Sequence, residues 1–259
     1  MALTKTKVAA GVVGLLLVAM AVVVKLVFFP SVSDKFFQTN AVLRQAPPGL
    51  AIVRPTHFPK PPTNGITFST VKGSQWIVGR NVTFQNLIAI AYSYNPGRIS
   101  LPVGLPKNNF DFLVTVPKDP EAGLRSAIRK KLGYTAQPET RDTLVLALKV
   151  EDPNSPGLKV SLDSEKENTN VKNGRLYFTH TQLSVVTDGL EGILKTPLVD
   201  KTGLTNYYDF SLIWDAQTAQ QIQSGTLDQA TGQKILADWG LALESDTASL
   251  EMLVVKKSK

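Results

Sequence analysis

The chain of 259 residues contains no cysteine and only two histidines. The missing cysteines exclude disulfides, thiolate nucleophiles and cysteine-ligated zinc or iron–sulfur sites. His57 and His180 lie at no recognisable spacing from a serine or a carboxylate, so neither a hydrolase triad nor a two-histidine metal site is indicated. Glycine-rich phosphate loops and nucleophile elbows are also missing. We therefore predict no catalytic residue, no metal site and no cofactor.

The chain also lacks a dense basic region. Its formal net charge is +7, from 28 basic and 21 acidic residues. Six lysines lie near the two ends of the chain: Lys5, Lys7, Lys25, Lys256, Lys257 and Lys259. Without them the body is close to neutral, whereas a nucleic-acid-binding domain shows a basic face. We predict no nucleic-acid partner.

One long apolar stretch stands near the N-terminus. Val8 to Val24 is uninterrupted by polar residues, and the stretch reaches Phe29 if Lys25 extends toward the headgroups. Crossing a bilayer takes roughly 20 helical residues. We predict a cytoplasmic tail at 1–7 and a transmembrane anchor at 8–29 that contacts membrane lipid.

The basic tail orients this anchor, because basic residues stay on the cytoplasmic side. The chain is then a single-pass membrane protein with a periplasmic or extracytoplasmic body. A cleaved signal peptide is the alternative, since Ala19-Met20-Ala21 has the small-x-small form of a cleavage site. It would export the body as well, whereas the third interpretation, a buried core helix, would not.

The body is expected to contain two structured parts, at 49–150 and 174–259. A polar spacer at 30–48 leads into the first part, and a polar linker at 151–173 separates the two. In the first part the pattern predicts strands at Leu50–Arg54, Ile66–Val71, Gln75–Val78 and Phe110–Val116. It also predicts a helix after Thr83, a helix from Asp119 to about Leu132, and a hairpin of Tyr134–Gln137 with Thr143–Val150.

The second part repeats motifs of the first. Phe110-Asp111-Phe112 corresponds to Tyr208-Asp209-Phe210, and Leu132-Gly133-Tyr134 corresponds to Trp239-Gly240-Leu241. The offset is 98 residues for the first pair and 107 for the second. Such self-similarity indicates two copies of one small unit of strands and helices. We predict an α+β fold of two copies that pack together or share a sheet, with mostly antiparallel strands.

Several motifs resemble an uncharacterised soil-bacterial family (Acidobacteria, Verrucomicrobia and relatives) called domain of unknown function 3738. They are Gly79-Arg80-Asn81-Val82-Thr83, Phe110-Asp111-Phe112, Leu132-Gly133, Glu139-Thr140-Arg141-Asp142, Val199-Asp200-Lys201-Thr202-Gly203-Leu204 and Tyr208-Asp209-Phe210. The resemblance spans roughly Leu50 to Lys256. It implies an exported bacterial protein without an established activity, and it supplies no catalytic residue. The chain departs from the family pattern at Asn206-Tyr207, where Gly-Leu-Thr-Gly usually precedes Tyr-Asp-Phe.

Asp111 and Asp209 occupy equivalent positions in the two copies. If the copies face each other, the two carboxylates form an acid–base pair. The alternative is that each accepts backbone N–H bonds locally. Asp200-Lys201-Thr202-Gly203 looks like the phosphorylated-aspartate motif of cation pumps. It fits equally a strand end followed by a turn, with Gly203 at positive φ.

Arg125, Arg129 and Lys130 form a basic stripe on the predicted second helix. This stripe would touch anionic lipid or a polyanionic partner, or it is a solvated helix face. Asp111, Asp209, Arg125, Arg129, Asp200 and Lys201 are therefore the candidate binding residues.

The anchor, the duplicated unit and the lack of a reactive cluster favour a binding or assembly module of the bacterial envelope. Its partner would be a protein or an envelope polymer. One alternative is an accessory subunit of a membrane complex. The other is an enzyme that acts on envelope polymers through carboxylates.

Overall fold

The computed structural model describes residues 34–37, 45–58, 65–71, 74–162, 166–172, 175–213, 215–224 and 227–258. The chain divides into two compact units, Met1–Pro47 and Pro48–Lys259. In the first unit, η1 (Asp34–Phe37) is a short 3-10 helix. The predicted anchor at 8–29 lies outside the described residues. No helix within the described ranges has the length and apolar character needed to cross a membrane.

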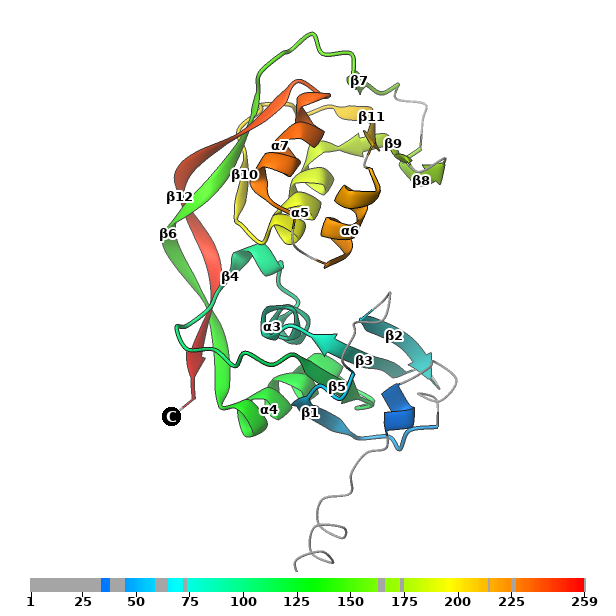
Figure 1. Cartoon of the computed structure of the whole chain (residues 1–259), viewed down its shortest axis with the longest axis vertical. Coiled ribbons are helices and arrows are strands. Elements are labelled where there is room, and N and C mark those ends of the chain that lie inside the picture. The colour runs from blue at the N-terminus through cyan, green and yellow to red at the C-terminus, as the bar shows by residue number, and fades with distance from the viewer. Residues whose placement is uncertain are drawn as a thin grey trace, which may run out of the picture. The chain divides into compact units, whose positions relative to one another are not determined.

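The second unit begins with an antiparallel sheet. Its strands are β1 (Ala51–Pro55), β2 (Ile66–Val71), β3 (Ser74–Val82) and β5 (Phe110–Val114), in the order β1-β5-β3-β2. The helices α3 (Phe84–Tyr92) and α4 (Pro120–Leu132) pack beside it. Phe112 of β5 meets Leu87 of α3 and Leu124 of α4 in one buried core. We call residues 51–132 the N-terminal lobe (Figure 1).

Both helices of this lobe begin at residues that the sequence predicts, and α4 also ends at one, Gly133. The Thr83 hydroxyl accepts a hydrogen bond from the Asn86 N–H, and the Asp119 carboxylate accepts one from the Ala122 N–H. Each satisfies a backbone donor that lacks a partner within the helix. Gly133, at φ 73°, ends α4 in the left-handed region that glycine tolerates best.

A second antiparallel sheet has the order β7-β11-β9-β8. Its strands are β7 (Leu158–Val160), β8 (Asn168–Lys172), β9 (Arg175–Gln182) and β11 (Tyr207–Ile213). The helices of this part are α5 (Leu183–Leu194), α6 (Ala216–Ser224) and α7 (Gln229–Ala237). Leu183, Phe210 and Leu236 contribute to its core. We call residues 158–237 the C-terminal lobe.

The prediction of a linker at 151–173 is wrong for β7 and β8. The segment is polar, but β7 pairs with β11 and β8 pairs with β9. Strand formation here depends on neighbouring strands rather than on the segment's own composition.

The third sheet joins the two lobes. Its order is β10-β6-β12-β4, with β4 (Ile99–Ser100), β6 (Tyr134–Val150), β10 (Leu198–Asp200) and β12 (Leu241–Lys257). The long strands β6 and β12 pair antiparallel over their full 17 residues, from Tyr134 opposite Lys257 to Val150 opposite Leu241. We call this pair the ribbon; it runs along both lobes (Figure 1).

The predicted hairpin at 134–150 is wrong. The chain does not turn at Pro138–Asp142 but continues as one strand. The polar residues there resemble a turn in the sequence. In the fold, their backbone partners are residues 249–253 of β12.

The ribbon supplies both hydrophobic cores. Tyr134 at the start of β6 and Leu253 near the end of β12 lie in the core of the N-terminal lobe. Leu148 of β6 and Leu241 of β12 lie in the core of the C-terminal lobe. Each core is therefore completed by strand segments from distant parts of the sequence. The fold is α+β with mostly antiparallel strands; the parallel pairs among the described strands are β10 with β6 and β4 with β12.

Candidate functional site

Asp111 of β5 is fully buried and saturated with donors. Its Oδ1 accepts hydrogen bonds from the Thr56 hydroxyl at 2.7 Å and the Asn81 N–H at 3.0 Å. Its Oδ2 accepts one from the His57 N–H at 2.9 Å, and an Arg54 Nη2 lies 3.3 Å away. A buried carboxylate with this many donors holds neighbouring strands together and has no atom left for a ligand.

Asp209 of β11 repeats only part of this arrangement. Its Oδ1 accepts a hydrogen bond from the His180 N–H at 2.8 Å, and its Oδ2 accepts none from the described residues. The two backbone donors are alike, because Asn81 and His180 both adopt left-handed φ, 52° and 49°. The prediction that both aspartates accept backbone N–H bonds is confirmed. They lie in different sheets, β5 and β11, so they do not form an acid–base pair.

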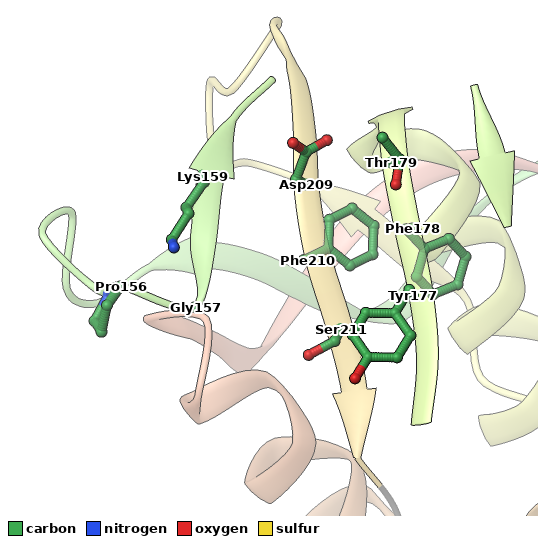
Figure 2. A pocket seen from close by; sticks show the side chains of 9 residues that line it. All are labelled: Pro156, Gly157, Lys159, Tyr177, Phe178, Thr179, Asp209, Phe210 and Ser211. Carbon is green, nitrogen blue, oxygen red and sulfur yellow. The ribbon is translucent and has the colours of Figure 1, made fainter. Parts of the chain in front are cut away.

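Asp209 lines a hollow of about 380 Å³ on the C-terminal sheet (Figure 2). The nine lining residues are Pro156, Gly157, Lys159, Tyr177, Phe178, Thr179, Asp209, Phe210 and Ser211. Charged and hydroxyl-bearing side chains enter it from the neighbouring strands β7, β11 and β9 (Figure 2). In the strand register Lys159 stands opposite Asp209, and Tyr177 opposite Ser211.

The rim of this hollow and its two phenylalanine rings are fixed by packing. The Phe178 ring stacks on Phe210 at 4.6 Å between centroids. At the rim, a Cβ added to Gly157 would lie 1.9 Å from the Asp238 carbonyl oxygen, so only glycine fits. Neither Lys159 nor Tyr177 was among the residues predicted from the sequence. Lys159 falls in the segment expected to be a linker, and neither residue belongs to a recognisable motif.

A second cavity, a groove of about 660 Å³, lies between α3 and α5. Its apolar lining residues are Ile66, Ala89, Ile90, Pro96, Ile193 and Ile222. They come from β2, α3, η2 (Pro96–Arg98), α5 and α6, and hence from both lobes. The groove exists only because the two lobes are packed together.

Two polar residues at the rim of this groove are held by hydrogen bonds, and the bond of Asn95 joins the two lobes. The Asn95 side chain donates a hydrogen bond to the Asp188 carbonyl at 2.9 Å. The Tyr94 hydroxyl donates to the Glu251 carboxylate on β12. Burial raises the pKa of Tyr94 to about 12, and the nearby Glu251 carboxylate adds to this rise. The phenol therefore stays protonated at physiological pH and remains a donor.

An ion pair between a partly exposed arginine and a buried glutamate lies beside this groove. The Arg98 Nε lies 2.7 Å from Oε1 of Glu191, which is only 2% exposed. The same oxygen accepts the Leu198 N–H at 3.2 Å. A Cβ on Gly97 would lie 2.6 Å from the Glu191 Cγ, so η2 packs directly on this side chain. This pair was not predicted, since nothing in a single sequence connects two residues 93 positions apart.

Asp200 and Lys201 form a local turn. The Asp200 Oδ1 accepts hydrogen bonds from the N–H and the hydroxyl of Thr202, at 2.8 and 2.7 Å. Gly203 has a φ of 70°, as predicted for a turn. The Lys201 Nζ lies 2.6 Å from the Asp246 Oδ2 on β12. These contacts favour the turn over the phosphorylated-aspartate motif.

Arg125 and Arg129 of α4 do not act as one stripe. The Arg125 guanidinium donates to the Ala91 carbonyl at 2.8 Å and lies 5.6 Å from the centroid of the Tyr92 ring. It joins α4 to the end of α3. Arg129 lies exposed on the last turn of α4.

Residues 85–257 match a family described as "Protein of unknown function (DUF3738)". The chain belongs to this family. The DUF3738 match covers more than half of the chain but starts later than the expected Leu50, so it leaves out β1 to β3. It contains the ribbon and every residue of the hollow. No curated protein and no solved structure matches the chain.

Among the described residues, no group of three or more histidine, aspartate or glutamate side chains is placed to hold a metal ion.

Proposed function

We propose that this protein is an extracytoplasmic binding module of the cell envelope, and that it binds a partner in the groove between α3 and α5. One observation carries the proposal: a groove of about 660 Å³ with apolar walls from both lobes. Ligand sites typically have about 300–1,000 Å³ and an apolar lining with few fixed polar groups. Tyr94 and Asn95 are such groups here, because their hydrogen bonds hold them in place.

The partner that suits this groove is an apolar segment of another envelope protein. The groove lies between two helices, and its rim carries an acidic and a basic residue, Asp188 and Lys195. Amphipathic helices bind grooves of this kind through apolar side chains spaced three and four residues apart. An accessory subunit of a membrane complex would use the same surface.

We further infer that the two lobes are copies of one unit, so that the groove is a site between copies. The sheet orders β1-β5-β3-β2 and β7-β11-β9-β8 support this inference, since corresponding strands hold corresponding places. The ribbon supports it too. Asp142 pairs with Ser249, 107 residues further on, which is the offset expected between equivalent positions.

The proposed placement has an N-terminal anchor at 8–29 with a tail at 1–7 and a spacer at 30–48. The support is the apolar run of Val8–Val24 with Lys5 and Lys7 before it. A phosphatase fused to the C-terminus, active only outside the cytoplasm, should be active in cells. Carbonate extraction should leave the chain in the membrane pellet. If the fused phosphatase is inactive because the C-terminus lies in the cytoplasm, this placement is wrong.

The groove is tested with substitutions on one helix. Ile193→Lys puts a charge into the groove, whereas Val185→Lys changes a residue of α5 that is already 46% exposed. The full chain in mild detergent is titrated with a fluorescein-labelled amphipathic leucine–lysine peptide, and binding is followed by anisotropy. We expect Ile193→Lys to weaken binding roughly tenfold and Val185→Lys to leave it unchanged. Equal binding by both variants contradicts the proposal.

Nothing in the described geometry favours an enzyme that acts through Asp111 and Asp209. Such enzymes hold two carboxylates on either side of one scissile bond. Here one carboxylate is buried under four donors, and the other lies in a different sheet.

A further inference from the structure

We propose that the hollow on the C-terminal sheet, shown in Figure 2, binds a neutral carbohydrate chain. This site is separate from the groove between α3 and α5, and the proposal does not depend on that groove. It rests on an exposed aromatic ring, on polar groups that have no partner among the described residues, and on a comparison with equivalent positions in the N-terminal lobe.

The aromatic ring is that of Tyr177, which is 37% exposed on the sheet surface. A sugar ring has one face of C–H groups and an edge of hydroxyls. Its C–H face can cover an aromatic ring and remove apolar surface from water on both sides. Tyr177 stands opposite Ser211 in the register, so a hydroxyl group lies beside the ring.

The polar groups that line the hollow have hydrogen-bonding capacity to spare. Among the described residues, no partner contacts the Lys159 ammonium, the Thr179 hydroxyl, the Ser211 hydroxyl or the Oδ2 of Asp209. Sugar hydroxyls both donate and accept, so they can satisfy this mixture of donors and acceptors. The other Asp209 oxygen is held by the His180 N–H, which orients the carboxylate before a ligand arrives.

The N-terminal lobe has a different surface at the equivalent positions. Where the C-terminal lobe has Ser211 and Tyr177, the N-terminal lobe has Leu113 and Val78, and both are buried. Asp111 likewise has four donors where Asp209 has one backbone donor. The same unit thus carries apolar buried residues in one lobe and polar, open residues in the other. A purely structural role does not require this difference.

The charges of the hollow identify a neutral ligand. It has one cationic and one anionic side chain, Lys159 and Asp209. A polyanion such as a nucleic acid would need an excess of basic groups. The OB-fold, another small β fold, binds oligosaccharides on a strand face and its adjoining loops.

The experiment is calorimetric titration of the full chain in mild detergent with neutral tetrasaccharides: cello-, chito-, malto- and xylotetraose. We expect one of them to bind. Tyr177→Ala should weaken this binding roughly tenfold, since the stacked ring carries much of the apolar contact. Asp209→Asn should weaken it severalfold, with the unfolding midpoint showing that the fold is kept.

The matched control is Phe68→Ala, which removes an aromatic ring that is 54% exposed on β2 of the N-terminal lobe. It should leave sugar binding unchanged. Ile193→Lys should also leave it unchanged, so failure of the groove and failure of the hollow are distinguishable. The proposal is overturned if no tetrasaccharide binds at millimolar concentration, or if Phe68→Ala weakens binding as much as Tyr177→Ala.

Discussion

At the scale of single residues, two equivalent aspartates meet different surroundings. Asp111 is buried beneath four donors, and Asp209 receives one backbone N–H and faces an open hollow. Each accepts a hydrogen bond from the backbone N–H of a residue with left-handed φ in the neighbouring strand, Asn81 or His180. The shared contact explains why both aspartates recur in the sequence. The extra donors of Asp111 make its carboxylate the more important one for stability.

We predict that Asp111→Asn lowers the free energy of unfolding by about 3 kcal/mol, because an amide turns a donor toward buried N–H groups. Asp209→Asn is the control and should cost at most about 1 kcal/mol. Urea unfolding of both variants measures the difference. Equal losses would show that the extra donors of Asp111 contribute nothing.

A second prediction concerns acid stability. Lys256, Gln137 and Arg141 all donate hydrogen bonds to Glu139 and lower its pKa from 4.5 to about 2. Because the pKa is lower in the folded chain than in the unfolded chain, the ionised carboxylate stabilises the fold above about pH 4.5. This stabilisation is lost as the pH falls toward 2.

Urea midpoints of the wild type and of Glu139→Gln should therefore differ at pH 7 and converge near pH 2. Salt at 1 M should reduce the difference at pH 7, since the group is at the surface. A difference that persists unchanged down to pH 2 would refute the electrostatic explanation.

Residue patterns predicted local features well. Thr83, Asp119, Gly133 and Gly203 have the expected roles because caps and turns depend only on residues a few positions away. The Arg98–Glu191 pair was not predictable from the sequence.

At the scale of elements, the ribbon is the main departure from what the sequence predicts. Pro138 to Asp142 have the composition of a turn, yet they lie in the middle of a strand. Pairing with β12 decides the structure of this segment, and local preference does not. Similarly, β7 and β8 lie in a segment whose composition predicts a linker, because strand formation depends on partners far away in the sequence.

Because β12 contributes residues to both cores, we predict that two substitutions in this one strand destabilise different lobes. Leu253→Ala should destabilise the N-terminal core and Leu241→Ala the C-terminal core, each by roughly 2–5 kcal/mol. Hydrogen exchange should then increase more in α3 and α4 for the first variant, and more in α5 and α7 for the second. The same exchange pattern in both variants would mean that the ribbon does not divide between the lobes.

At the scale of the whole molecule, the sequence predicts the fold class and the family, both of which are confirmed. Composition and alternation suffice for an α+β class with mostly antiparallel strands. The groove and the hollow could not be predicted, because each combines residues from segments that only the fold brings together.

Since the two cores share strands, we predict that residues 49–150 do not fold as an independent domain. This fragment lacks Leu253 and Val255, which complete its core. Circular dichroism should show no cooperative unfolding of the fragment alone. Coexpression with residues 151–259 should restore it. A cooperative transition of the isolated fragment would contradict this prediction.

The pairing of β6 with β12 also has a consequence during synthesis of the chain. The ribosome completes Asp142 well before Ser249, its partner in the ribbon. At about 5–20 residues per second, the edge of β6 waits roughly 5–20 s for its own partner. During that interval the unpaired edge of β6 can pair with the equivalent strand of another nascent molecule. Factors that keep the growing polypeptide apart from its neighbours should therefore raise the yield of correctly folded monomer.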